Sequence, residues 1–165
     1  MSKSVIILNG PSSSGKSTLV SILKEMIKCK KNVEYGSITI DDYLRMSRDE
    51  AIYEDDVFEV SSNICENVTK MLDTHQGVII DHVITSERIF KQLIESLKMY
   101  DVCLVHVTCP LSELERRENE RGNRCPGSAK ASFQYLYPKD GYDLTVDTSI
   151  LSSEDCSLRV VDILQ

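Results

Sequence analysis

A glycine- and serine-rich octapeptide at residues 10–17 stands out because it ends in a lysine followed by a hydroxyl residue. It fits the pattern G-x-x-x-x-G-K-[ST]. Backbone N–H groups that converge on one anion need conformations that glycine tolerates best. A helix that begins here adds unsatisfied amides and the positive end of its dipole. The motif therefore predicts phosphate binding by Gly10, Pro11, Ser12, Ser13, Ser14, Gly15, Lys16, Ser17 and Thr18. Lys16 would reach the β- and γ-phosphates of a nucleotide and Ser17 would bind Mg²⁺.

Carboxylates follow three short apolar runs that have the composition of buried strands, at Asp41–Asp42, Asp81 and Asp147. In open parallel sheets, ligands lie beyond the carboxyl ends of the strands. We interpret Asp81 as a Mg²⁺ ligand, either directly or through water, with a helix N-cap as the alternative. Asp41 is the candidate base for the proton of a substrate hydroxyl. Asp42 could take its place, and a polar turn is the alternative for both.

The densest basic patch in the chain contains Arg117, Arg121 and Arg124. Glu113 and Arg117 are four residues apart and can pair on a solvated helix surface. Arg117 and Arg121 have the same spacing, at which like charges repel unless an anion lies between them. We therefore expect a mobile lid at about 119–130, whose arginines close over the phosphates and stabilise the charge of the transferring group.

Apolar runs alternate with segments of helical periodicity, a pattern typical of an α/β fold with a parallel sheet covered by helices. We expect one domain over residues 1–165, with strands at 5–8, 37–40, 78–81, 102–108 and 144–147. Helices should carry the apolar positions of 19–27, 57–72, 89–97 and 160–164, with a further charged helix from about Leu111. Gly77 is expected to end the second of these helices, and Ser152 to cap the last.

The composition restricts partners and location. The formal net charge of -7 disfavours general binding to nucleic acid or to an anionic membrane. The six cysteines contain no CxxC pair, so we expect reduced thiols in an intracellular protein. The apolar run before Asn9 is only four residues long, too short for a signal peptide or a membrane span, and we expect a cytoplasmic protein.

Several of these blocks, taken together and in order, resemble chloramphenicol phosphotransferase-like proteins. They are the segment 6–17, Asp41 after a short strand, the stretch that ends at Asp81, the segment 117–124, and 142–149, which reads Tyr-Asp-Leu-Thr-Val-Asp-Thr-Ser. The resemblance implies a three-layer P-loop kinase fold with a five-stranded parallel sheet flanked by helices. It also implies ATP, Mg²⁺ and phosphorylation of a hydroxyl on chloramphenicol or a related small molecule.

The same resemblance implies roles for individual residues. An aspartate matching Asp41 looks like the catalytic base, arginines matching Arg121 and Arg124 belong to the lid, and Thr148 and Ser149 would lie near the adenine. The sequence departs from the family in the acidic stretch 45–59, which we expect to shape the acceptor pocket. Tyr137 also stands where a histidine is expected.

The sequence thus predicts transfer of the ATP γ-phosphoryl group to the hydroxyl of a small molecule. Another P-loop kinase, acting on a nucleotide sugar, a nucleoside or a sugar acid, is the first alternative, because a fold predicts the donor side better than the acceptor side. A nucleotide-dependent regulatory switch is the second. The Asn-Lys-x-Asp motif typical of a GTP switch does not occur in the sequence.

Overall fold

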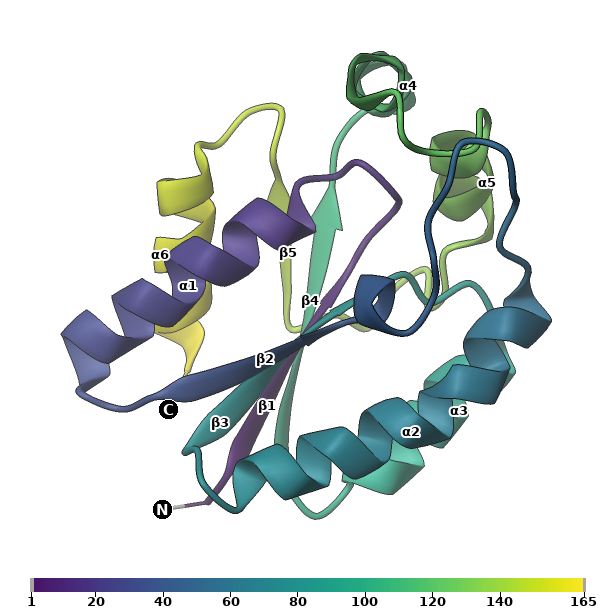
Figure 1. Ribbon diagram of the computed structural model, residues 1–165. Helices are drawn as coiled ribbons and strands as arrows, with labels where there is room; N and C mark the ends of the chain where they lie inside the picture. The colour runs from purple at the N-terminus through teal and green to yellow at the C-terminus, as the bar shows by residue number, and fades with distance from the viewer. Residues whose placement is uncertain (1, 165) are drawn as a thin grey trace.

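The apolar runs pair into one parallel sheet in the computed structural model, which describes residues 2–164 (Figure 1). Its five strands, within that range, have the order β2-β3-β1-β4-β5 and pair in parallel throughout. They are β1 (Ser4–Asn9), β2 (Tyr35–Thr39), β3 (Gly77–His82), β4 (Asp101–Thr108) and β5 (Leu144–Asp147). The five-stranded parallel sheet that the sequence predicted is confirmed. Since β3 and β4 lie on opposite sides of β1, the loop after β1 is at the switch point where such sheets bind ligands.

Helices cover both faces of the sheet and its carboxyl edge (Figure 1). One face carries α1 (Lys16–Lys31) and α6 (Ser153–Ile163), and the other carries α2 (Glu54–Leu72) and α3 (Glu87–Leu97). A short 3-10 helix, η1 (Ile40–Asp42), follows β2. Beyond the strand ends lie α4 (Leu111–Arg121) and α5 (Ser128–Tyr135).

The central strand β1 is buried on both faces, which explains its uninterrupted apolar sequence. Val5 and Ile7 pack into the core beneath α2 and α3, whereas Ile6 and Leu8 pack into the core beneath α1 and α6. All four side chains have no solvent exposure. A rigid double-sided core therefore anchors the loop that follows β1.

The prediction that Gly77 ends a helix is wrong. The helix α2 ends at Leu72, with Asp73 as its C-cap, and Gly77 is the first residue of β3. A Cβ atom at Gly77 would lie 2.4 Å from Cε2 of Tyr35 and 2.8 Å from the carbonyl oxygen of Ser4. The glycine is needed because the first residues of three strands meet closely there.

The arginine-rich segment is more regular than the sequence indicated. Its first residues belong to α4, which runs to Arg121, and its last belong to α5, which begins at Ser128. Only residues 122–127 between the two helices are irregular. The helix α5 was not predicted, and the mobility of the lid stays a prediction.

Two other strand and helix ends differ slightly from expectation: β2 ends at Thr39, one residue early, and α6 ends at Ile163. Ser152 caps α6, accepting a hydrogen bond from the Asp155 amide at 3.1 Å. No helix in the described part of the chain is long and apolar enough to cross a membrane. The six cysteines, all within that part, are free thiols.

Candidate active site

The loop that joins β1 to α1 is built around backbone conformations and close contacts that restrict its sequence. Gly15 precedes α1 with a φ of 96°, and Ser13 has a φ of 71°, both in the left-handed region. A Cβ atom at Gly10 would lie 2.1 Å from the carbonyl oxygen of Val107. The two glycines of the motif are therefore required for a left-handed turn and for a close approach to β4.

The Lys16 ammonium is buried inside this loop, with 6% of the residue exposed. Its Nζ donates to the carbonyl oxygen of Pro11 at 3.0 Å and to Oγ of Ser14 at 3.4 Å. Burial lowers the pKa of Lys16, an effect that the nearby carboxylates of Asp81 and Asp41 oppose. Since no carboxylate in residues 2–164 forms an ion pair with it, this is a cation suited to a polyphosphate.

Asp81 lies where β3 approaches the start of α1, and two hydroxyl groups converge on one of its oxygens. Oδ2 accepts from Oγ of Ser17 at 3.0 Å and from Oγ1 of Thr39 at 3.4 Å. Mg²⁺ binds such oxygen donors, typically one or two carboxylates completed by water and phosphate oxygens. No cluster of three or more His, Cys, Asp or Glu that could hold a metal occurs within 2–164, but the Ser17–Asp81 pair fits Mg²⁺ shared with a nucleotide.

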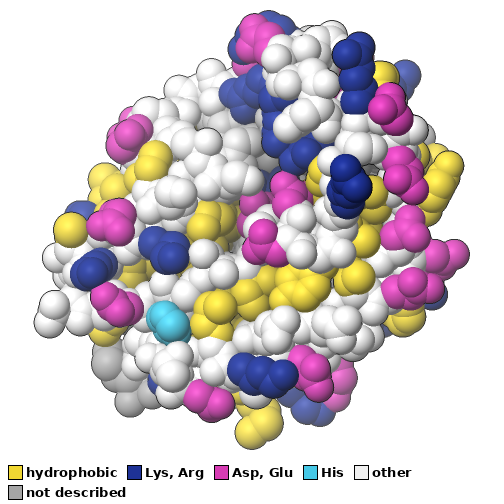
Figure 2. Space-filling view, viewed as in Figure 1, with side chains coloured by type: hydrophobic (Ala, Val, Ile, Leu, Met, Phe, Trp, Pro, Cys, Tyr) yellow, Lys and Arg dark blue, Asp and Glu magenta, His cyan; other side chains and the backbone are white. Residues whose placement is uncertain are grey.

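Asp41 and Arg124 form an ion pair at the lining of a cavity of about 1180 Å³. Nη2 of Arg124 lies 2.9 Å from Oδ2 of Asp41, and the Arg124 side chain is 12% exposed. Both residues line the cavity, together with Lys16 and Asp81, whereas the neighbouring Asp42 is not part of its lining. The structure therefore brings Asp41, and not Asp42, to the site. Lys and Arg side chains gather around a hollow beside acidic groups in Figure 2.

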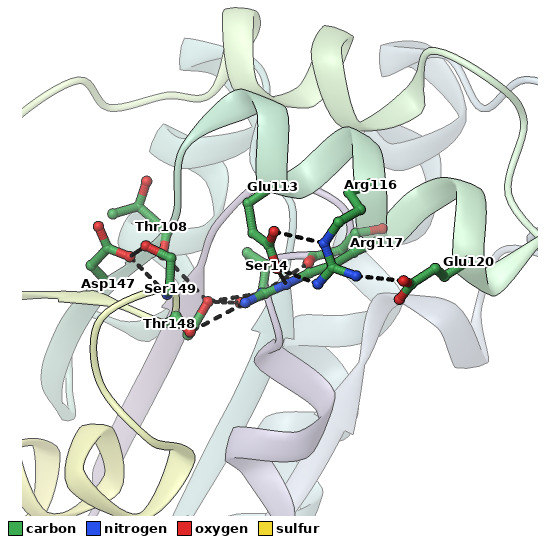
Figure 3. A network of polar contacts seen from close by, with 10 residues as sticks. Ser14, Thr108, Glu113, Arg116, Arg117, Glu120, Asp147, Thr148 and Ser149 are labelled. Carbon is green, nitrogen blue, oxygen red and sulfur yellow. Dashed lines mark hydrogen bonds and ion pairs between the residues drawn. The ribbon is translucent and has the colours of Figure 1, made fainter.

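Arg117 braces the phosphate-binding loop against the segment after β5 (Figure 3). Its Nη1 donates to Oγ1 of Thr148 at 2.9 Å and to the Ser13 carbonyl at 3.4 Å, and its Nη2 donates to the Thr148 carbonyl at 3.2 Å. Oγ1 of Thr148 donates in turn to the Ser14 carbonyl at 2.7 Å, and Nε of Arg117 to Glu113 at 3.0 Å. Arg117 and Thr148 thus join the predicted loop, in contact with its backbone.

Ser149 and Asp147 point elsewhere. The Ser149 amide and hydroxyl donate to Oδ1 of Asp147 at 2.8 Å and 2.6 Å. Neither residue lines the cavity, although Thr148 between them does. The third strand-end carboxylate therefore stabilises a turn and does not join Asp41 and Asp81.

Arg121 lines the cavity from the last turn of α4. Burial lowers its pKa, as does the positive charge of Arg124. In the part of the chain that the structure describes, its guanidinium makes no hydrogen bond or ion pair. Its donors are available to an anionic ligand, in contrast to those of Arg117.

The acidic stretch 45–59 forms one wall of the cavity, and its members there include Met46, Glu50, Ile52, Tyr53 and Glu54. Glu54 is fixed by hydrogen bonds from Oγ of Ser86 and Nε of Arg88, both at 2.6 Å, and these bonds lower its pKa to about 2. The opposite wall comes from α5, with Ala131 and Tyr135.

Tyr137 does not line the cavity, and the Tyr142–Asp143 pair is structural. The ring of Tyr137 packs edge-on against Phe90, with 5.6 Å between centroids. Oη of Tyr142 accepts from Asn9 at 2.9 Å and donates to the carbonyl of residue 138 at 2.7 Å. Oδ2 of Asp143 accepts from the Leu104 amide at 2.7 Å. The pair holds the segment before β5 against β1 and β4.

The sequence reasoning missed two residues that contact the site. Thr39 caps η1 by accepting a hydrogen bond from the Asp41 amide at 3.3 Å and also contacts Asp81. Its position as a polar residue at the end of a strand could have indicated that it belongs to the site. Oγ of Ser132, on α5, accepts from the Ser12 amide of the loop at 2.9 Å. Nothing in the local sequence around Ser132 indicates that contact.

A parallel sheet with this strand order, and a glycine-rich loop and lysine at its switch point, define a protein with the P-loop kinase fold. The chain belongs to the family of chloramphenicol phosphotransferase-like proteins, whose model matches residues 3–165. No curated protein matches the sequence.

Three solved structures share this fold and differ widely from the chain in sequence. A Mycobacterium tuberculosis APS kinase, in complex with AMPPNP and APS, has a TM-score of 0.74 and 17% identity, over 98% of this chain and 96% of that one. A gluconokinase from Sinorhizobium meliloti has a TM-score of 0.69 and 20% identity, over 96% and 93%. A sugar kinase from a Janibacter species has a TM-score of 0.69 and 16% identity, over 98% and 94%.

Proposed function

We propose that this protein is an ATP-dependent phosphotransferase that moves the γ-phosphoryl group to a hydroxyl of a small molecule. The observation that supports this most directly is the convergence of Lys16, the Ser17–Asp81 pair and the Asp41–Arg124 pair on one cavity. Membership of the chloramphenicol phosphotransferase-like family supports the same reaction.

The donor side of the proposed site is the loop 10–18. Its amides and Lys16 would hold the phosphates. Arg117 and Thr148, which contact the loop backbone, would lie beside the bound nucleotide, with Ser149 next to them. Ser17 and Asp81 would hold Mg²⁺, which when bound neutralises phosphate charge. A triphosphate carries the negative charge that the loop amides and the Lys16 ammonium would bind.

In the proposed reaction the acceptor oxygen attacks the γ-phosphorus while the bond from that phosphorus to the β,γ-bridging oxygen breaks, releasing ADP. The acceptor hydroxyl proton passes to Asp41. Arg124, which pairs with Asp41 in the structure, and Arg121 would stabilise the charge that spreads over the transferring group. Alignment and charge stabilisation contribute most of the acceleration, and the base contributes part.

The acceptor would occupy the part of the cavity between the 45–59 stretch and α5. The family makes chloramphenicol or a related alcohol the first candidate. Nucleotide sugars, nucleosides and sugar acids are the alternatives within this class, and a regulatory nucleotide switch is the alternative outside it. From the net charge of -7 we expect neither nucleic acid nor membrane as a partner. The free cysteines support the cytoplasmic location that we propose.

A combined thermal-shift and ATP-consumption screen against hydroxylated small molecules tests the proposal, with chloramphenicol as the first compound. ATP loss that depends on one alcohol, and that is abolished in Lys16→Ala, is the expected result. Slow hydrolysis that no alcohol stimulates but a protein partner alters would favour the switch. Absence of nucleotide binding in the presence of magnesium would refute both the phosphotransferase and the switch.

A further inference from the structure

Glu118 is a buried carboxylate at the back of the arginine segment. It follows Arg117 on α4, and only 7% of the residue is exposed. Its Oε1 accepts from the Ala129 amide at 2.8 Å and its Oε2 accepts from the Gly127 amide at 3.2 Å. No cation pairs with it in the described residues. The carboxylate is therefore held entirely by the start of α5.

Two properties of this contact require a carboxylate. Gly127, with a φ of 91°, is the N-cap of α5, and the partly positive N-terminus of a helix favours a negative group. Two separate amides each need an acceptor. A carboxylate offers two equivalent oxygens, whereas a glutamine offers one oxygen and one NH₂ group that opposes the second amide. Glutamine has the same size and lacks that second acceptor.

The contact closes the loop that carries Arg124. Arg121 ends α4, Arg124 lies in the loop 122–127, and α5 begins at Ser128. Glu118 ties the two ends of that loop together, and Arg124 reaches Asp41 at 2.9 Å from within it. The next turn of α5 is fixed by the hydrogen bond of 2.9 Å from the Ser12 amide to Oγ of Ser132.

We propose that Glu118 is a positioning residue for the transfer reaction, acting through Arg124. Its carboxylate holds α5 and the loop 122–127 against α4, so that the Arg124 guanidinium stays at Asp41 and the transferring group. This role rests on the proposed function, because only that function makes Arg124 a catalytic residue.

Glu118→Gln is the test variant, and Glu115→Gln is its matched control, because Glu115 is an exposed carboxylate on the same helix. Hydrogen exchange without any substrate comes first. We expect at least tenfold faster exchange of the amides at 127–131 in Glu118→Gln, and no change in β1 or in the control. Unchanged exchange at 127–131 would overturn the proposal, whether or not the protein proves to be a kinase.

Kinetics with the acceptor found in the screen then test the route through Arg124. We expect Glu118→Gln to lower kcat about 10- to 100-fold, as the loss of a hydrogen bond to a charged group implies. The KM for ATP should stay within about threefold because Lys16 keeps its own contacts and the Ser12–Ser132 hydrogen bond still holds the loop against α5. Glu115→Gln should remain within twofold of wild type. Normal kcat in Glu118→Gln despite faster exchange would make Glu118 merely structural.

A double-mutant cycle completes the test. If Glu118 acts through Arg124, adding Glu118→Gln to Arg124→Ala lowers kcat by less than about threefold further. Multiplicative losses would overturn the proposal. Should Glu118→Gln not fold, Glu118→Asp enters the same cycle, since it keeps the charge and shortens the reach. A failed screen, by contrast, refutes the proposed function and leaves the exchange result to decide the structural contact.

Discussion

Replacing Lys16 by Met should weaken nucleotide binding without lowering the stability of the fold. The ammonium is 6% exposed and its partners are a carbonyl and a hydroxyl at 3.0 Å and 3.4 Å. Burial lowers its pKa, so the folded protein disfavours the charge. Met fills similar space without it. We expect the unfolding free energy to stay equal or to rise by about 1 kcal/mol, which is roughly 2–4 °C in Tm for a chain of this length.

The same replacement removes the cation that would meet the phosphates. A hydrogen bond to a charged group contributes about 1.5–3 kcal/mol, which corresponds to about 10- to 150-fold in Kd. We therefore expect Lys16→Met to weaken binding of a non-hydrolysable ATP analogue with Mg²⁺ by that factor. A residue kept for folding would show the reverse pattern, with lost stability and unchanged affinity.

Titration calorimetry and thermal melts on the same preparations give both quantities. Lys30→Met is the matched control, because Lys30 is an exposed lysine in the last turn of α1. It should leave Kd within twofold and Tm within a few degrees of wild type. Equal affinity in Lys16→Met and Lys30→Met, with a lower Tm in the former, would refute the assignment of the loop as a phosphate site.

Three further predictions follow from the other acidic groups of the cavity. Asp41→Asn should lower kcat about 10²- to 10⁴-fold with little change in the KM for ATP, whereas Asp42→Asn should keep kcat within twofold of wild type. Equal losses of kcat in the two variants, measured by steady-state kinetics, would refute the assignment of Asp41 as the base. Asp81→Asn should raise the Mg²⁺ concentration for half-maximal rate about tenfold or more, and a magnesium titration that matches wild type would contradict its role. Glu54, whose pKa is lowered to about 2 by hydrogen bonds from Arg88 and Ser86, should stabilise the fold above about pH 5, where its carboxylate is ionised in both folded and unfolded chains. That stabilisation is lost as pH falls toward 2. Glu54→Gln should therefore have a Tm about 2–4 °C below that of wild type at pH 7, and this difference in Tm should become smaller below pH 5. A difference in Tm that does not depend on pH would show that the ionised Glu54 carboxylate is not the source of the stabilisation.

The sheet and the donor side could be predicted because both are encoded locally. Five apolar runs gave the strands, and one octapeptide, residues 10–17, gave the loop. The error at Gly77 has the opposite cause. A glycine after a helical pattern is also what a C-cap looks like, and only the approach of Tyr35 and Ser4 from two other strands shows that it begins β3.

The helix α5 and its contacts could not be predicted for a similar reason. Its buried residues are Ala129 and Ser132, too small and too few to give an apolar periodicity. Its position depends on Glu118 of α4 and on the Ser12 amide of the loop. In sequence, Glu118 is one charge among several in a basic segment, and nothing distinguishes it from an exposed residue.

The grouping of four cationic side chains at the site is a consequence of strand pairing. The chain has a net charge of -7, yet Lys16 and Arg117, Arg121 and Arg124 all line one cavity. They come together because β1 pairs directly with β4, so that the loop after one strand lies beside the helix after the other. A polyphosphate bound there would contact both the loop after β1 and the helix α4 after β4. Nucleotide binding should therefore stabilise the whole fold, by an amount set by ligand concentration over Kd, and not the loop alone.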